Sequence, residues 1–209
     1  MSTTTKQVIN QSIIDNAMTY GQYRQMIDEL VNKNETTGDD HSEEMIEYTK
    51  MNVQRMDRLD KQIELADSLV EKLNQLDESW VWLILTEAWC GDAAQNVPII
   101  AKIADQTENI ELRLILRDQH LNIIDEYLTD GGRSIPKLVC LDAETLQEIG
   151  TWGPRPGDFQ KKAMEWKNDS DISKEEWAEK LHKWYAKNKG QELMADFEEL
   201  LNQWSTNDR

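Results

Sequence analysis

The sequence predicts an α/β fold: a sheet covered by helices, with further helices at both ends of the chain. WVWLILT at 80–86 is a continuous apolar run typical of a strand buried on both faces, and IELRLIL at 110–116 predicts a second strand. KLVCLD at 137–142 and LQEIGTW at 146–152 predict a hairpin. The order strand, helix, strand, helix, hairpin therefore indicates a sheet with helices on its faces.

Residues 1–79 predict an N-terminal helical extension. Apolar residues at steps of three and four indicate one helix over roughly 9–32 and a long amphipathic helix over about 42–76, with the loop NKNETTGDD between them. A coiled-coil seam is the alternative for the long helix. Its few heptads favour packing on its own domain.

The central part, residues 80–168, predicts two helices between its strands. One runs from about 92 to 106, and Pro98 inside it should kink the helix because proline removes a backbone donor. A shorter one, 121–128, ends at the Gly131–Gly132 pair.

Residues 169–209 predict a C-terminal helical extension. A helix begins before it at about Gly157, and a capping box at Ser173–Glu176 opens the next. An apolar stripe continues after Gly190. Because such stripes are too narrow to build independent cores, we expect both extensions to pack on the central part.

The charge and composition exclude several function classes. The 209-residue chain has a formal net charge of −17, which disfavours nucleic acid and anionic membranes as partners. No run approaches a membrane span, and MSTTTKQVINQS has no apolar core of signal length, so we expect a cytoplasmic protein. Two cysteines make no disulfide framework. His41, His120 and His182 are scattered, so no metal or cofactor is expected.

Two segments resemble the thioredoxin family. Trp89-Cys90-Gly91 ends a buried strand and opens a helix, with Pro98 eight residues after the cysteine, and Ser134–Lys137 resembles the family's cis-proline loop. Four segments are similar in sequence to a bacterial branch of this family that has long helical flanks: Trp-Cys-Gly-Asp, Leu116–Asp118, Gly132–Lys137 and Trp152–Pro156. The resemblance covers about residues 79–168 and implies a thioredoxin-like core.

The resemblance fails at the family's chemistry. Thioredoxins exchange disulfides through a Cys-x-x-Cys pair, in which the second thiol resolves the mixed disulfide. Ala93 stands in place of that thiol, and Ile84 in place of the family's buried acid. Cys140 lies in a strand roughly 13 Å from the proline loop, too far to form a disulfide there. A dithiol oxidoreductase is therefore excluded.

The remaining candidate site surrounds Cys90, the candidate catalytic residue. The dipole of its helix favours a thiolate, whereas Asp92 opposes one. We expect Arg117 and Arg155 to lie nearby, where each either stabilises a thiolate or holds a carboxylate of a peptide or glutathione, or instead pairs with a neighbouring acid.

Substrate contacts are also expected from Trp89, from Asp92 and from the proline loop. The Ile135–Pro136 bond should be cis, placing the Ile135 backbone against the Cys90 sulfur for pairing with an extended peptide.

Two hypotheses follow from this site. In the first, which we favour from the sequence, Cys90 is a one-thiol nucleophile with a pKa below about 8.5. It forms mixed disulfides with protein or low-molecular-weight thiols, and an external thiol resolves them. In the second, the protein is a redox-silent thioredoxin-fold interaction module, and its flanking helices form part of the partner surface. The sequence indicates no oligomeric state.

Overall fold

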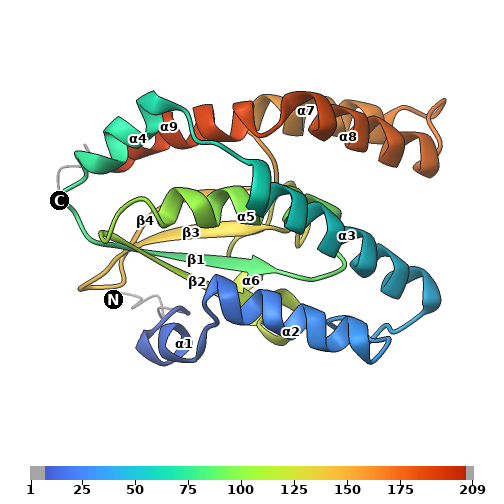
Figure 1. Cartoon of the computed structure of the whole chain (residues 1–209), viewed down its shortest axis with the longest axis horizontal. Coiled ribbons are helices and arrows are strands. Elements are labelled where there is room, and N and C mark those ends of the chain that lie inside the picture. The colour runs from blue at the N-terminus through green and yellow to red at the C-terminus, as the bar shows by residue number, and fades with distance from the viewer. Residues whose placement is uncertain (1–7, 206–209) are drawn as a thin grey trace, which may run out of the picture.

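The computed structural model describes residues 8–205, and Figure 1 shows its elements. Four strands form one sheet in the order β2-β1-β3-β4: β1 (Trp80–Thr86), β2 (Ile110–Leu116), β3 (Lys137–Asp142) and β4 (Glu148–Trp152). β1 pairs in parallel with β2 and antiparallel with β3, and β3 and β4 form the hairpin. The predicted α/β sheet is confirmed, with three strands at their predicted bounds.

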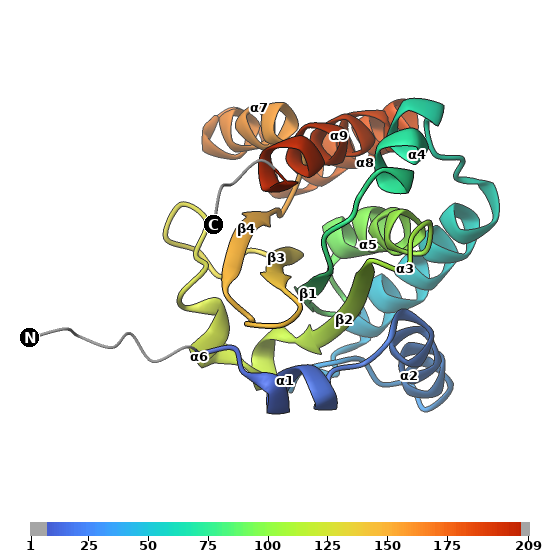
Figure 2. The ribbon, with the colours of Figure 1, turned by 90° about the vertical axis from the view of Figure 1, so that its left-hand side faces the viewer.

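The helices are α1 (Gln11–Asn16), α2 (Tyr20–Asn32), α3 (Glu43–Gln62), α4 (Asp67–Asn74), α5 (Gly91–Ala104), α6 (Leu121–Ile124), α7 (Gly157–Asn168), α8 (Lys174–Asn188) and α9 (Gln191–Ser205). A 3-10 turn at Arg117–Gln119 precedes α6. Figures 1 and 2 show α5 and α9 on one side of the sheet and α1, α2 and α6 on the other. This arrangement buries β1 on both faces, as its apolar run predicts.

Each of the two long helices predicted before residue 79 is broken in the structure. Between α1 and α2, Met18 leaves the helix and exchanges two backbone hydrogen bonds with Leu114 at the edge of the sheet, at 2.9 and 2.8 Å. After α3, Ile63 adopts an extended conformation and is buried in the core. The prediction of uninterrupted helices was wrong because the apolar periodicity continues through both breaks, where tertiary contacts replace the helical hydrogen bonds.

The C-terminal helix α9 packs directly on the sheet. The Phe197 ring lies 5.1 Å from that of Trp82 and 5.5 Å from that of Trp152, between ring centroids. Trp204 approaches the sheet so closely that a Cβ on Gly150 would lie 2.1 Å from its Nε1 atom. Residues of both extensions share one apolar cluster with the sheet, so the extensions pack on the core, as predicted.

Helices α7 and α8 form a smaller apolar cluster of their own, centred on Phe159, Ala163, Leu181 and Tyr185. The capping box predicted at Ser173 is present at the start of α8. Polar contacts of this helical pair with the rest of the molecule include those of Tyr185 with Asp92, of Gln160 with Arg155 and of His182 with Arg55.

Within residues 8–205, no helix combines the length and the apolar character needed to cross a membrane. Nor do three or more His, Cys, Asp or Glu side chains of this range gather as metal ligands. The first residues of the N-terminal extension and the last of the C-terminal one, 1–7 and 206–209, lie outside the described part of the chain.

Candidate functional site

Cys90 lies at the end of the turn that connects β1 to α5. After the last residue of the buried strand, Thr86, the chain turns through Glu87–Trp89, and Cys90 becomes the N-cap residue of α5. Its Sγ atom accepts a hydrogen bond from the backbone N–H of Ala93 at 3.4 Å. The helix therefore begins on the cysteine itself, with the sulfur satisfying one of the first unpaired N–H groups.

The proline loop meets the other side of the sulfur. The Ile135–Pro136 peptide bond is cis, and Ile135 is only 5% exposed. The Cys90 thiol donates a hydrogen bond to the Ile135 carbonyl oxygen at 3.3 Å. The structure thus brings together Cys90, Ile135 and Pro136, which the sequence placed in one site.

Burial governs the ionisation of Cys90. The residue is 8% exposed, and this burial raises the pKa of its thiol to about 12, with the charge of Asp92 adding to the rise. The Ala93 N–H and Arg155 act in the opposite direction and are outweighed. The expectation of a lowered pKa was therefore wrong, because a thiolate here would lose its contact with water.

Asp92 and Arg155 form a largely buried ion pair beside Cys90. The guanidinium of Arg155 binds both carboxylate oxygens of Asp92, and their side chains are only 9% and 12% exposed respectively. Tyr185 of α8 donates a third hydrogen bond to Asp92 at 2.7 Å, while Gln160 accepts one from Arg155 at 2.8 Å. Arg155 is thus engaged by an acid of its own fold.

Arg117 is also paired within the fold. Its guanidinium forms an ion pair with Asp118 at 2.8 Å and lies 4.9 Å from the ring centre of Trp89. It also donates a hydrogen bond to the Arg133 carbonyl at 3.2 Å. The alternative in which each arginine pairs with a neighbouring acid therefore describes both of them.

Glu87 is the buried acid that the sequence reasoning did not assign to the site. It is fully buried, and its Oε1 atom accepts a hydrogen bond from the Asp118 backbone N–H at 2.9 Å. Its Oε2 atom is buried with no hydrogen-bond partner in the described structure. Burial raises the pKa of this carboxyl. Its place three residues before Cys90, directly after a buried strand, was the available signal.

Two further residues hold the site and were also missed. Asn52 of α3 is completely buried and donates a hydrogen bond to the Ala88 carbonyl at 2.9 Å, which fixes the turn before Cys90. Tyr185, the second, lies on α8 and donates its hydrogen bond to Asp92. An asparagine among the buried positions of α3 was a detectable signal, whereas the contact of Tyr185 across 93 sequence positions was not.

Cys140 is not part of this site. It lies within β3, fully buried, where it pairs with Trp82 of β1 and Gly150 of β4 in the sheet. Both cysteines are reduced thiols. This placement agrees with the sequence argument that Cys140 lies in a strand, away from the proline loop.

Comparisons with known structures support the same fold. A crystal structure of a protein of unknown function from Pseudomonas aeruginosa matches with a TM-score of 0.58 and 16% sequence identity, over 91% of this chain and 95% of that one. An HIV epitope-scaffold structure of the 4E10 type matches with the same TM-score and identity, over 91% of this chain and 96% of that one. No match was found among curated proteins.

The sequence itself matches a family model described as thioredoxin over residues 38–170. The match spans the site turn, the proline loop, the whole four-stranded sheet and the helices α3 and α4 that precede it. The chain belongs to the thioredoxin family.

Proposed function

We propose that this protein is a thioredoxin-fold binding module in which Cys90 serves as a structural thiol. One observation carries the proposal: the thiol is enclosed and donates its hydrogen bond to the Ile135 carbonyl. The resemblance assigns the Ile135 backbone to pairing with a substrate peptide. In this chain its carbonyl already has an internal partner.

The chemistry of exchange supports the same conclusion. A disulfide is broken by a thiolate, which bonds to one sulfur while the other leaves as a thiolate. With a pKa of about 12, the Cys90 thiol is almost entirely protonated at neutral pH. Ala93 supplies no second sulfur, and the polar contacts of Asp92, Arg155 and Tyr185 hold α8 next to the site. Binding through the flanking helices requires none of these groups to react.

A one-thiol exchange function is the second candidate. It is favoured by the position of Cys90 as the N-cap of α5, because the Ala93 N–H directed at the sulfur stabilises a thiolate. In that case Cys90 attacks a protein or low-molecular-weight disulfide, releases one of its halves as a thiol, and is freed by an external thiol.

Glutathione disulfide distinguishes the two functions. The native protein is incubated with it at neutral pH, and adducts are measured by intact mass spectrometry, with Cys90→Ser and Cys140→Ser variants as controls. The binding-module proposal predicts no adduct on the folded protein. A stoichiometric glutathione adduct that is lost in Cys90→Ser and kept in Cys140→Ser would overturn it in favour of one-thiol exchange.

A further inference from the structure

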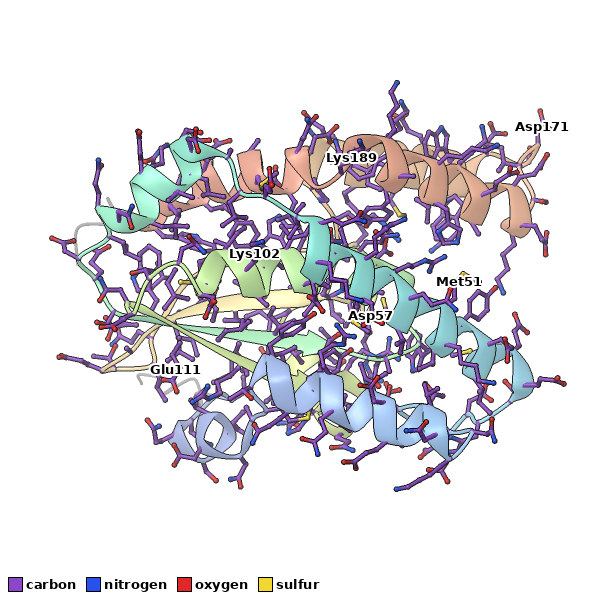
Figure 3. The ribbon with its side chains drawn as sticks, viewed as in Figure 1. Met51, Asp57, Lys102, Glu111, Asp171 and Lys189 are labelled. Carbon is purple, nitrogen blue, oxygen red and sulfur yellow. The ribbon has the colours of Figure 1, made fainter. Side chains whose placement is uncertain are left out.

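A cavity of about 390 Å³ lies between α3, α8 and the first residues of α5. Its walls include Tyr48 and Arg55 from α3, Trp89 from the site turn, and Trp177 and His182 from α8. Figure 3 shows the labelled Met51 on the side of α3 that faces α8. The volume is in the range of small-molecule sites, and aromatic side chains from three elements surround it.

The charge of Arg55 in this cavity is not balanced. In the described structure its side chain has no carboxylate within ion-pair distance, and its hydrogen-bond partners are neutral: Asn52 Oδ1 at 2.8 Å, the Met51 sulfur, and the ring nitrogens of His182 at 3.2–3.3 Å. The charge of Asp92 raises the pKa of Arg55 from a distance, but the Asp92 carboxylate is already paired with Arg155. A half-buried guanidinium thus lacks a direct acidic partner in a chain with a net charge of −17.

His182 does not supply a compensating charge. Burial and the neighbouring Arg55 both lower the pKa of its imidazole, so the ring is neutral at pH 7. Burial likewise lowers the pKa of Arg55, which shows that the guanidinium is partly removed from water without full compensation. An anion placed beside Arg55 would restore that compensation through charge-assisted hydrogen bonds.

The rim of the cavity limits the charge of the ligand. Glu44 and Glu175 lie there, exposed to solvent, together with the exposed Lys174. Two rim acids against one rim lysine disfavour a polyanion. The interior, by contrast, offers the guanidinium of Arg55 and the apolar faces of Trp89 and Trp177. Asp92, an acid that also lines it, is paired with Arg155.

We propose that this cavity binds a small aromatic monocarboxylate, with its ring between the aromatic side chains of α3, α8 and the site turn and its carboxylate on Arg55. The proposal rests on the binding function proposed above and names its ligand class. Its test is independent of thiol chemistry, so failure here leaves the glutathione experiment to decide the role of Cys90.

The probe is 1-naphthylacetate, with the uncharged amide 1-naphthylacetamide as its neutral counterpart, each titrated into the full-length protein by isothermal titration calorimetry. The proposal predicts that the acid binds at least tenfold more tightly than the amide. Arg55→Gln should reduce the affinity for the acid at least tenfold and leave that for the amide unchanged. Arg58→Gln is the matched control, because it removes the same charge from an exposed position one turn along α3 that does not line this cavity.

Equal binding of acid and amide by the wild-type protein, or no binding of either, would overturn the proposal without any variant. So would an equal loss in Arg55→Gln and Arg58→Gln, which would indicate general attraction of an anion to a positive surface. Circular dichroism verifies that each variant is folded, and the acid–amide comparison remains decisive if Arg55→Gln is not.

Discussion

Replacing Asp92 with asparagine tests whether the ion pair beside Cys90 holds the site together. Asp92→Asn keeps the shape of the side chain and an oxygen that accepts hydrogen bonds, but leaves Arg155 as a largely buried cation without its acid. Breaking a buried pair by removing one partner costs about 3–5 kcal/mol. Because the amide retains part of the hydrogen bonding, we expect the lower end, about 3 kcal/mol.

Two measurements give the loss of stability in Asp92→Asn. For a chain of this size a loss of about 3 kcal/mol lowers Tm by about 6–12 °C, and urea unfolding followed by circular dichroism gives the free energy directly. The same variant should lower the pKa of Cys90, because the charge of Asp92 is the second largest cause of its rise.

Asp125→Asn provides the matched control. It makes the same substitution in an Asp–Arg pair with Arg133, whose side chains are each 45% exposed. Exposed pairs contribute little to stability, so this variant should unfold close to the wild type. If Asp92→Asn is no less stable than Asp125→Asn, the Asp92–Arg155 pair does not hold the site, and the reasoning is refuted.

Three further variants test other parts of the structure. Gly150→Ala places a Cβ against Trp204 and should cost about 1–3 kcal/mol in urea unfolding; an unchanged midpoint would contradict the close packing of α9 on the sheet. The folded-state pKa of Glu87 is raised, so this residue's contribution to stability is present below its ordinary pKa and is lost as pH rises through the folded value. Glu87→Gln should therefore gain stability relative to the wild type as pH rises from 5 to 8, and a difference that does not vary with pH would count against a buried ionisable Glu87. Tyr185→Phe removes a hydrogen bond to a charged group and should cost about 1.5–3 kcal/mol; no measurable loss would mean that the hydroxyl does not hold α8 to Asp92.

Much of the fold could be predicted from the sequence because local patterns carry it. β1 is apolar from Trp80 to Leu85, since it is buried on both faces, and three strands have their predicted bounds. The breaks near Met18 and Ile63 could not be predicted in the same way. At both positions the chain leaves the helix to reach partners elsewhere in the fold, and the spacing of apolar residues does not change there.

The site could be predicted in its members but not in its electrostatics. The Trp-Cys-Gly-Asp stretch and the proline loop identified Cys90, Ile135 and Pro136, and in the structure the Cys90 thiol is hydrogen-bonded to Ile135, which a cis bond joins to Pro136. Whether the pKa of Cys90 is raised or lowered depends instead on how deeply the loop and the neighbouring residues bury the sulfur. That burial, like the reach of Tyr185 from α8 to Asp92, arises only when distant segments pack together.

Whether Cys90 is a buried, protonated thiol can be measured by the rate at which iodoacetamide alkylates it in the native protein as a function of pH, with peptide mapping to separate Cys90 from Cys140. We expect almost no modification of Cys90 at pH 7–8 in the folded protein and rapid modification after unfolding in urea. The apparent native pKa should lie well above the ordinary thiol value of about 8.5. Rapid alkylation of the folded protein with an apparent pKa below that value would contradict this expectation.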